Sequence, residues 1–215
     1  MCFCAEASFG AAGILAITGL LTIRSTTKKS QRMLAAVPII FALQQAAEGV
    51  LWVSAQNNQL LWLHTIAAYA FLFCAFVIWP TWIPLALNTY EEYKKPVLTY
   101  LTYWGIVVSS ALMVLMIVSH MTITTHEHHV QYLFMLPEWI GILGTFLYAI
   151  PIITPFFICG KKYRIIMGIL LIVSAIITWL MWYNYFTSVW CFFSALLSIL
   201  IFYIITHKEI MDHKQ

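Results

Sequence analysis

Long apolar stretches recur along the whole chain and are separated only by short polar segments. A helix of about 20 apolar residues crosses a hydrocarbon core of about 30 Å at 1.5 Å per residue. Only 9% of the residues are charged, whereas soluble domains carry roughly 25%. The sequence therefore predicts an all-α polytopic membrane protein, a single transmembrane domain over 1–215 with seven helices at about 5–23, 33–54, 60–87, 97–118, 137–159, 165–184 and 187–206.

The third of these stretches is longer than a membrane requires and contains the segment WPTWIP, from Trp79 to Pro84. Proline interrupts helices, and tryptophan is enriched at membrane interfaces. We therefore expect a broken or interfacial helix end at headgroup depth, where this helix bends as it leaves the membrane.

The basic residues predict the orientation of the bundle. Every Lys and Arg falls in the first, third or fifth loop or in the C-terminal tail of a seven-helix arrangement: Arg24, Lys28, Lys29, Arg32, Lys94, Lys95, Lys161, Lys162, Arg164, Lys208 and Lys214. Cytoplasmic loops carry the excess of Lys and Arg, so we expect the N-terminus outside and the C-terminus in the cytoplasm. Because the basic residues follow the first apolar stretch, we expect that stretch to be an uncleaved anchor. The basic balance is thus an orientation signal and gives no indication of nucleic-acid binding.

Predicted helix two carries polar residues on one face. Gln44, Glu48 and Trp52 are four residues apart, and Gln45 lies beside them. An unpaired ionisable residue inside a membrane costs about 2–3 kcal/mol, so Glu48 should face the bundle interior and have a partner. The cluster is either interhelical hydrogen bonding, which membrane helices use for association, or a functional pocket. The two interpretations are compatible.

Further polar residues from separate parts of the chain share the depth of Glu48 in this arrangement. Cys2 precedes the first helix, His64 begins the third, and Cys191 begins the seventh. The fourth loop contains His120, His126, His128 and His129, and Glu138 follows it after Pro137. Thiolate, imidazole and carboxylate are ligands for zinc or copper, although the HEHH run is also explained as a solvated loop and Glu138 as a residue of a helix first turn.

The segments MCFCAEASFG, QQAAEGVLW, FVIWPTWIP, HHVQY and SVWCFF, in this order and at these separations, resemble a family of small bacterial seven-helix membrane proteins that begin Met-Cys-Phe-Ser and have no assigned activity. The resemblance covers essentially the whole chain and implies a multi-pass protein of the bacterial cytoplasmic (inner) membrane. Cys4, where serine is expected, departs from the family pattern. The positions that match the family's motifs are Cys2, Ser8, Gln44, Gln45, Glu48, Trp52, His128, Tyr132, Trp190 and Cys191.

Three functions are compatible with these residues. The first is a metal-dependent hydrolase or lipid-modifying enzyme with Glu48 as catalytic base or ligand. Its metal, zinc more than copper, would be held by residues from Cys2, Glu48, His64, His128, Glu138 and Cys191. The second is non-catalytic binding or sensing of a lipid or small molecule in a pocket of Gln44, Gln45, Trp52, Tyr132 and Trp190. The third is a thiol-redox or structural role with a disulfide between Cys2 and Cys191. Membrane lipids are the expected partners in each case.

Overall fold

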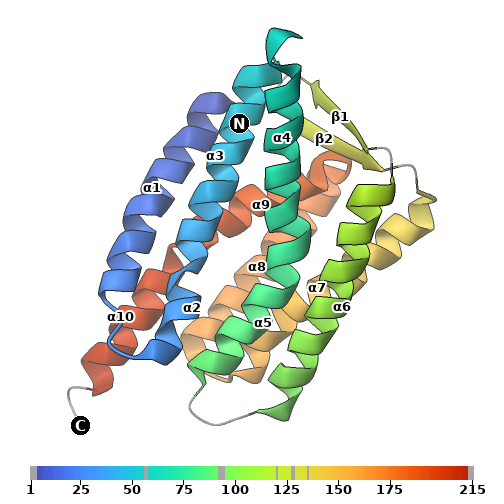
Figure 1. The fold of residues 1–215 in the computed structure, drawn as a ribbon. Helices are drawn as coiled ribbons and strands as arrows, with labels where there is room; N and C mark the ends of the chain where they lie inside the picture. Colours follow the sequence, from blue (N-terminus) through green and yellow to red (C-terminus); the bar gives the residue numbers. More distant parts are fainter. Residues whose placement is uncertain are drawn as a thin grey trace.

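The computed structural model describes residues 4–55, 58–91, 95–119, 121–126, 129–134 and 136–212. Within these residues, seven helical stretches are long and apolar enough to cross a membrane, as the sequence predicts. They run side by side in a bundle (Figure 1), an architecture that fits a multi-pass membrane protein. The stretches are Ala5–Arg24, Lys29–Ala55, Leu61–Tyr90, Pro96–Val118, Glu138–Ile158, Lys162–Met181 and Tyr183–Thr206.

Several of these stretches consist of more than one element. The helices are α1 (Ala5–Arg24), α2 (Arg32–Ala35), α3 (Val37–Ala55), α4 (Leu61–Leu72), α5 (Trp79–Tyr90), α6 (Pro96–Val118), α7 (Glu138–Ile158), α8 (Lys162–Met181), α9 (Phe186–Leu197) and α10 (Leu200–Asp212). Short 3-10 turns are η1 (Lys29–Gln31), η2 (Asn58–Leu60) and η4 (Tyr183–Tyr185), and η3 (Phe73–Ile78) is a π-helix.

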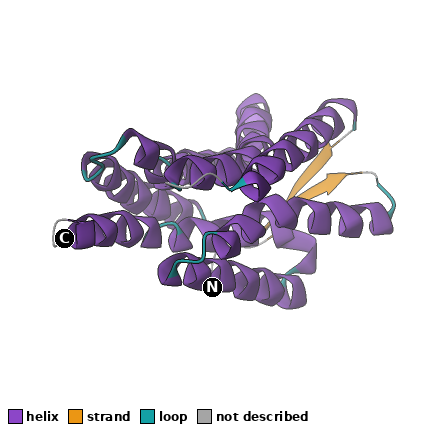
Figure 2. Ribbon diagram, turned by 90° about the horizontal axis from the view of Figure 1, so that it is seen from below, coloured by secondary structure: helices purple, strands orange, loops and turns teal. Residues whose placement is uncertain are grey.

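A β-hairpin between α6 and α7 replaces the loop expected from the sequence. Strand β1 (Met121–His126) pairs antiparallel with β2 (His129–Phe134), and Met121 lies opposite Phe134. Alternate residues of a strand share a face, and on β2 Val130 is fully buried while Tyr132 packs into the helices. The view turned by 90° shows the two strands at the edge of an otherwise helical bundle (Figure 2).

The third span is broken inside its length, and our expectation of a helix end at WPTWIP is wrong. Helix α5 continues through this segment to Tyr90, and Trp79 is buried inside the bundle at 3% exposure. The irregularity precedes it, in the π-helix η3, where the Trp79 N–H bonds back to the Cys74 carbonyl. Pro80 has no N–H, so the Ala75 carbonyl is left to accept a hydrogen bond of 2.6 Å from the Tyr148 hydroxyl of α7.

Helix α6 packs closely against this broken span. The Ser109 hydroxyl donates to the Val77 carbonyl at 2.8 Å and lies 3.0 Å from the Thr81 hydroxyl. A Cβ added at Gly105 would come within 1.9 Å of the Pro80 carbonyl oxygen, so only glycine allows this approach. The neighbouring helices thus satisfy backbone groups that the prolines and the π-helix leave open.

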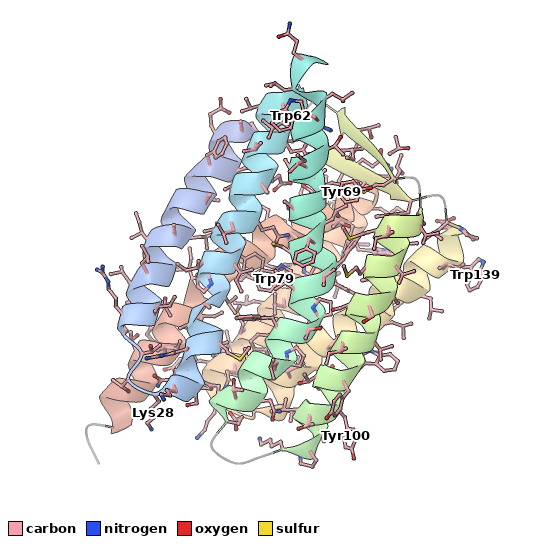
Figure 3. The ribbon with its side chains drawn as sticks, viewed as in Figure 1. Lys28, Trp62, Tyr69, Trp79, Tyr100 and Trp139 are labelled. Atoms are coloured by element: carbon pink, nitrogen blue, oxygen red, sulfur yellow. The ribbon has the colours of Figure 1, made fainter. Side chains whose placement is uncertain are left out.

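The two ends of the bundle differ in charge. The described Lys and Arg residues gather at one end, where α1 ends, α6 and α8 begin, and α10 ends; we call this the basic end. Lys28 lies there, and Trp62 lies at the opposite end near the strands, which we call the hairpin end (Figure 3). At the basic end the buried Arg164 forms an ion pair with Glu91, and its guanidinium lies 5.2 Å from the centre of the Tyr90 ring.

Candidate functional site

Helix α3 presents four polar side chains to the interior of the bundle. Gln44, Gln45, Glu48 and Trp52 are all buried, and the two glutamines have no exposed surface. Their spacing places them on one side of the helix, over the two turns from Gln44 to Trp52. Glu48 lies seven residues before Ala55, the end of α3, which is roughly 10 Å along the helix axis.

Two hydrogen-bond donors hold the Glu48 carboxylate. Gln45 Nε2 donates to Oε2 at 3.3 Å, and the Ser188 hydroxyl of α9 donates to Oε1. Ser188 is itself buried. The intramembrane carboxylate therefore has the partners that its burial demands.

The β-hairpin brings Tyr132 to the same place. Its ring stacks on Phe71 of α4 with the centroids 5.4 Å apart, and it packs in one cluster with Ala47 and Cys191. Burial raises the pKa of Tyr132 well above its usual range, and the nearby Glu48 and Cys191 raise it further. Its hydroxyl is therefore a neutral donor and acceptor beside Glu48.

Gln44 connects the polar face of α3 to the third span. The indole Nε1 of Trp79 donates to Gln44 Oε1 at 2.7 Å. Cys191, three residues after Ser188 on α9, is buried and packs in one cluster with Ala47 and Tyr132. We call this set of residues the Glu48 pocket: Gln44, Gln45, Glu48, Trp52, Tyr132, Ser188 and Cys191.

Four buried polar atoms of the Glu48 pocket have no hydrogen-bond partner within the described part of the chain. They are Gln44 Nε2, Gln45 Oε1, Trp52 Nε1 and the Tyr132 hydroxyl oxygen. Each such atom costs about 1–3 kcal/mol, so four together would cost about 4–12 kcal/mol, comparable with the whole stability of many proteins. These atoms therefore require partners other than the described residues, and a ligand or ordered water would supply them.

The other residues predicted to bind a metal are not part of the Glu48 pocket as defined above. Cys2 and His128 lie outside the described residues. His64 is buried on α4, one turn before Ala67 and Ala68, which pack with Trp52. Glu138 is exposed at the start of α7 and accepts a hydrogen bond of 3.4 Å from Tyr183.

Among the described residues, no three His, Cys, Asp or Glu side chains lie together so as to hold a metal ion. Glu48 and Cys191 are brought together, whereas the exposed Glu138 does not join them in such a group. Within the described part of the chain, Cys4, Cys74, Cys159 and Cys191 are free thiols. The disulfide alternative involves Cys2, which lies outside the described residues, and it stays a prediction. The metal site remains a prediction that depends on Cys2 and His128.

Sequence reasoning missed two residues of this region, Ser188 and Trp79. Ser188 precedes Cys191 by three residues and therefore shares its face of α9, a spacing that could have identified it. Trp79 gave no such signal, because its neighbours Pro80 and Trp82 favoured an interfacial position. Trp190, expected in the pocket, is buried but donates to Ser174 Oγ of α8 at 3.2 Å.

Comparison with known proteins places the chain in a family. The model of a family of unknown function, DUF6629, matches residues 1–215. No curated protein matches the chain. The resemblance found in the sequence is thereby confirmed at the level of a family without an assigned activity, and the chain belongs to the DUF6629 family.

Proposed function

We propose that this protein is a membrane-embedded binding protein whose Glu48 pocket holds the polar part of a small ligand. The observation that carries the proposal is the group of four polar atoms beside the Glu48 carboxylate that have no hydrogen-bond partner among the described residues. They come from α3 and from the hairpin, so a ligand bonded to them would join the two. If this cluster served only to hold the helices together by hydrogen bonds, these atoms would instead be bonded to one another.

The donors and acceptors indicate the chemistry of the ligand group. Gln44 Nε2 and Trp52 Nε1 can donate, Gln45 Oε1 can accept, and the Tyr132 hydroxyl can do either. The Glu48 carboxylate disfavours an anionic group in this low-dielectric site. An uncharged group that both donates and accepts, such as a hydroxyl or an amide, fits this set.

We also propose that the basic end faces the cytoplasm and the hairpin end faces outward, in the cytoplasmic membrane of a bacterium. The support is the positive-inside rule applied to the described Lys and Arg residues, which gather at one end. In this orientation the N-terminus and the Glu48 pocket lie toward the outside.

The test is to identify small molecules that co-purify with the protein in a mild detergent. Glu48→Gln and Tyr132→Phe alter the pocket, and Glu138→Gln is a matched control because Glu138 is an exposed acid. Solvent extraction and mass spectrometry should find a molecule with the wild type and with Glu138→Gln that is lost or reduced in the two pocket variants. Extracts that are identical for all four proteins would overturn the proposal and leave water as the occupant.

A second candidate function is acyl-ester hydrolysis, which the hydrogen bond from Ser188 to Glu48 favours. Glu48 would accept the Ser188 proton as Oγ attacks the ester carbonyl carbon, and the departing alcohol would then take that proton. Water, deprotonated by Glu48, would next attack the acyl-serine, release the acid and return the proton to Oγ. A hexadecyl fluorophosphonate should then label wild type and Ser194→Ala but not Ser188→Ala; equal labelling of all three would exclude this function.

A further inference from the structure

A groove on the outer surface of the bundle lies beside the broken third span. Residues of α3, of η3 and α5, and of α6 form its walls, and its volume is about 530 Å³. Pockets that bind small molecules have volumes of roughly 300–1,000 Å³. Six of its residues show its character: Ile40, Val77, Trp82, Ile106, Ser110 and Met113. The groove is therefore large enough for a ligand with a mainly apolar surface.

The groove opens at the surface that lipid covers in a membrane-spanning bundle. On α6, Ile106 and Met113 are 44% and 43% exposed, and Ser110 between them is also exposed. Val107 and Val114 of the same helix are exposed and apolar, as expected where a helix contacts lipid. None of the described residues that line the groove is charged. Hydrocarbon is therefore the group that these walls accommodate.

The connection from α1 to α2 carries four basic residues and no acid. They are Arg24, Lys28, Lys29 and Arg32, and all four side chains are exposed. We call residues 24–32 the basic segment. The buried Gln31 holds its backbone, because Oε1 accepts hydrogen bonds from the N–H groups of Thr27 at 3.1 Å and Lys28 at 3.2 Å. Lys29 and Arg32 form no ion pair with any residue that the structure describes, so both cations are available to an anion.

Trp82 joins the groove to the basic segment. It lines the groove, and its indole N–H donates a hydrogen bond of 3.0 Å to the carbonyl of Met33, the residue after Arg32. Helical hydrogen bonds also run from Ala36 to Arg32 and from Ile40 to Ala36, so Arg32 and the groove residue Ile40 share one face. They are eight residues apart, roughly 12 Å along the helix, and one leaflet provides roughly 15 Å of hydrocarbon. A molecule with its charge at Arg32 and its chain in the groove therefore fits within one leaflet.

We propose that one anionic phospholipid of the surrounding membrane binds here, with an acyl chain in the groove and its phosphate at Lys29 and Arg32. Basic residues beside a membrane attract anionic head groups, and a guanidinium forms paired hydrogen bonds with phosphate oxygens. The chain alone would give little selectivity, because the bilayer is as apolar as the groove. A phosphatidylcholine of equal chain length should bind worse, since its choline cation would lie beside the basic segment. The site shares no residue with the Glu48 pocket and does not depend on the ligand proposed there.

The probe that tests this inference is a phosphatidylglycerol with a photoreactive diazirine in one acyl chain. It is added to the full chain in phosphatidylcholine nanodiscs and illuminated, and the labelled residues are mapped by mass spectrometry. Label is expected on Ile106 and Met113. Excess unlabelled phosphatidylglycerol should displace it, and a diazirine phosphatidylcholine of the same chain length should label these residues more weakly.

One pair of variants tests the head-group site. Lys29→Gln combined with Arg32→Gln should raise the phosphatidylglycerol concentration for half-maximal labelling about tenfold, which corresponds to about 1.4 kcal/mol. Lys161→Gln combined with Lys162→Gln removes the same charge from exposed residues at the same end of the bundle. This control should leave the concentration for half-maximal labelling unchanged.

A second pair of variants tests the chain site. Ser110→Phe fills the groove and should abolish the label on Met113. Val107→Phe, at an exposed position of the same helix that does not line the groove, should not. Because both positions are exposed, neither change disturbs the core of the bundle.

The outcomes separate a specific lipid site from general attraction. Equal labelling by the two lipids, or label spread evenly over the exposed residues of α1 and α6, would overturn the inference. An equal loss of labelling in the two charge variants would also overturn it, because it would show attraction to the whole basic end. In each case the co-purification experiment still decides the function proposed for the Glu48 pocket.

Discussion

The indole of Trp79 donates a hydrogen bond of 2.7 Å to the amide oxygen of Gln44, with both side chains buried in the bundle. This bond joins α5, which follows the π-helix, to the polar face of α3. Gln44 Nε2, the other polar atom of this amide, has no hydrogen-bond partner among the described residues. The position of the Gln44 amide, and therefore the inner limit of the Glu48 pocket, is fixed by a residue of the broken third span.

Trp79→Phe should destabilise the protein by about 1–3 kcal/mol, because it leaves Gln44 Oε1 buried without its donor. The measurement is the apparent unfolding temperature of the purified protein in detergent. Trp62→Phe is the control, since Trp62 is 62% exposed. Equal unfolding temperatures for the two variants would show that the Trp79–Gln44 bond contributes nothing.

Gly105→Ala should destabilise the protein by about 1–3 kcal/mol or more, the usual cost of overpacking. The added Cβ would meet the Pro80 carbonyl oxygen, a backbone atom that cannot rotate away. Gly144→Ala is a matched control on α7, where an added Cβ meets nothing within 4 Å. Thermal unfolding of the two variants side by side tests this contact, and a Gly105→Ala protein as stable as Gly144→Ala would contradict it.

Arg164→Met should destabilise the basic end of the bundle, because it removes the main partner of Glu91. Breaking a fully buried ion pair costs about 3–5 kcal/mol, and the loss here should be smaller because Lys95 Nζ remains 3.9 Å from Glu91. Adding Glu91→Gln should restore part of the loss, since the second change removes the unpaired charge. Lys162→Met, at an exposed position in the same turn, should have little effect on the unfolding temperature, and an Arg164→Met protein no less stable would disprove the role of this pair.

The proposed orientation predicts which cysteines a membrane-impermeant maleimide can reach in intact cells. Gln59→Cys at the hairpin end should react, and Lys162→Cys at the basic end should react only after permeabilisation. Both are made in a background with Cys2→Ser and Cys4→Ser, because both cysteines precede α1 in the sequence, on the side expected to be outside. The reverse labelling pattern would invert the proposed topology.

Most of the helical architecture could be predicted from the sequence, because a bilayer imposes one length on every spanning helix. The β-hairpin could not, since its histidines and threonines are also typical of a solvated loop and the alternation of Val130 and Tyr132 is short. The sequence predicts a break of the third span at WPTWIP, whereas the π-helix that interrupts the span lies before it, at Phe73–Ile78. A proline in the sequence indicates that a backbone hydrogen bond of the helix is missing. It does not indicate which neighbouring side chain bonds the free carbonyl instead.

The candidate site was predicted in part for a similar reason. Periodicity placed Gln44, Glu48 and Trp52 on one face of a helix, and the structure buries all three. The sequence assigns Glu138 to the same site as Glu48, because both are expected at the same depth in the membrane. In the structure Glu138 is exposed and accepts a hydrogen bond from Tyr183. Angular position around a bundle depends on which helices are neighbours, and that information lies in long-range packing.

The hydrogen bonds of the π-helix have a consequence for the assembly of the bundle. The Val77 carbonyl is satisfied by a residue 32 positions later, and the Ala75 carbonyl by one 73 positions later. No water is available in a bilayer core to bond these carbonyls instead. The native hydrogen-bond pattern of the third span is therefore complete only when the fourth and fifth spans lie beside it.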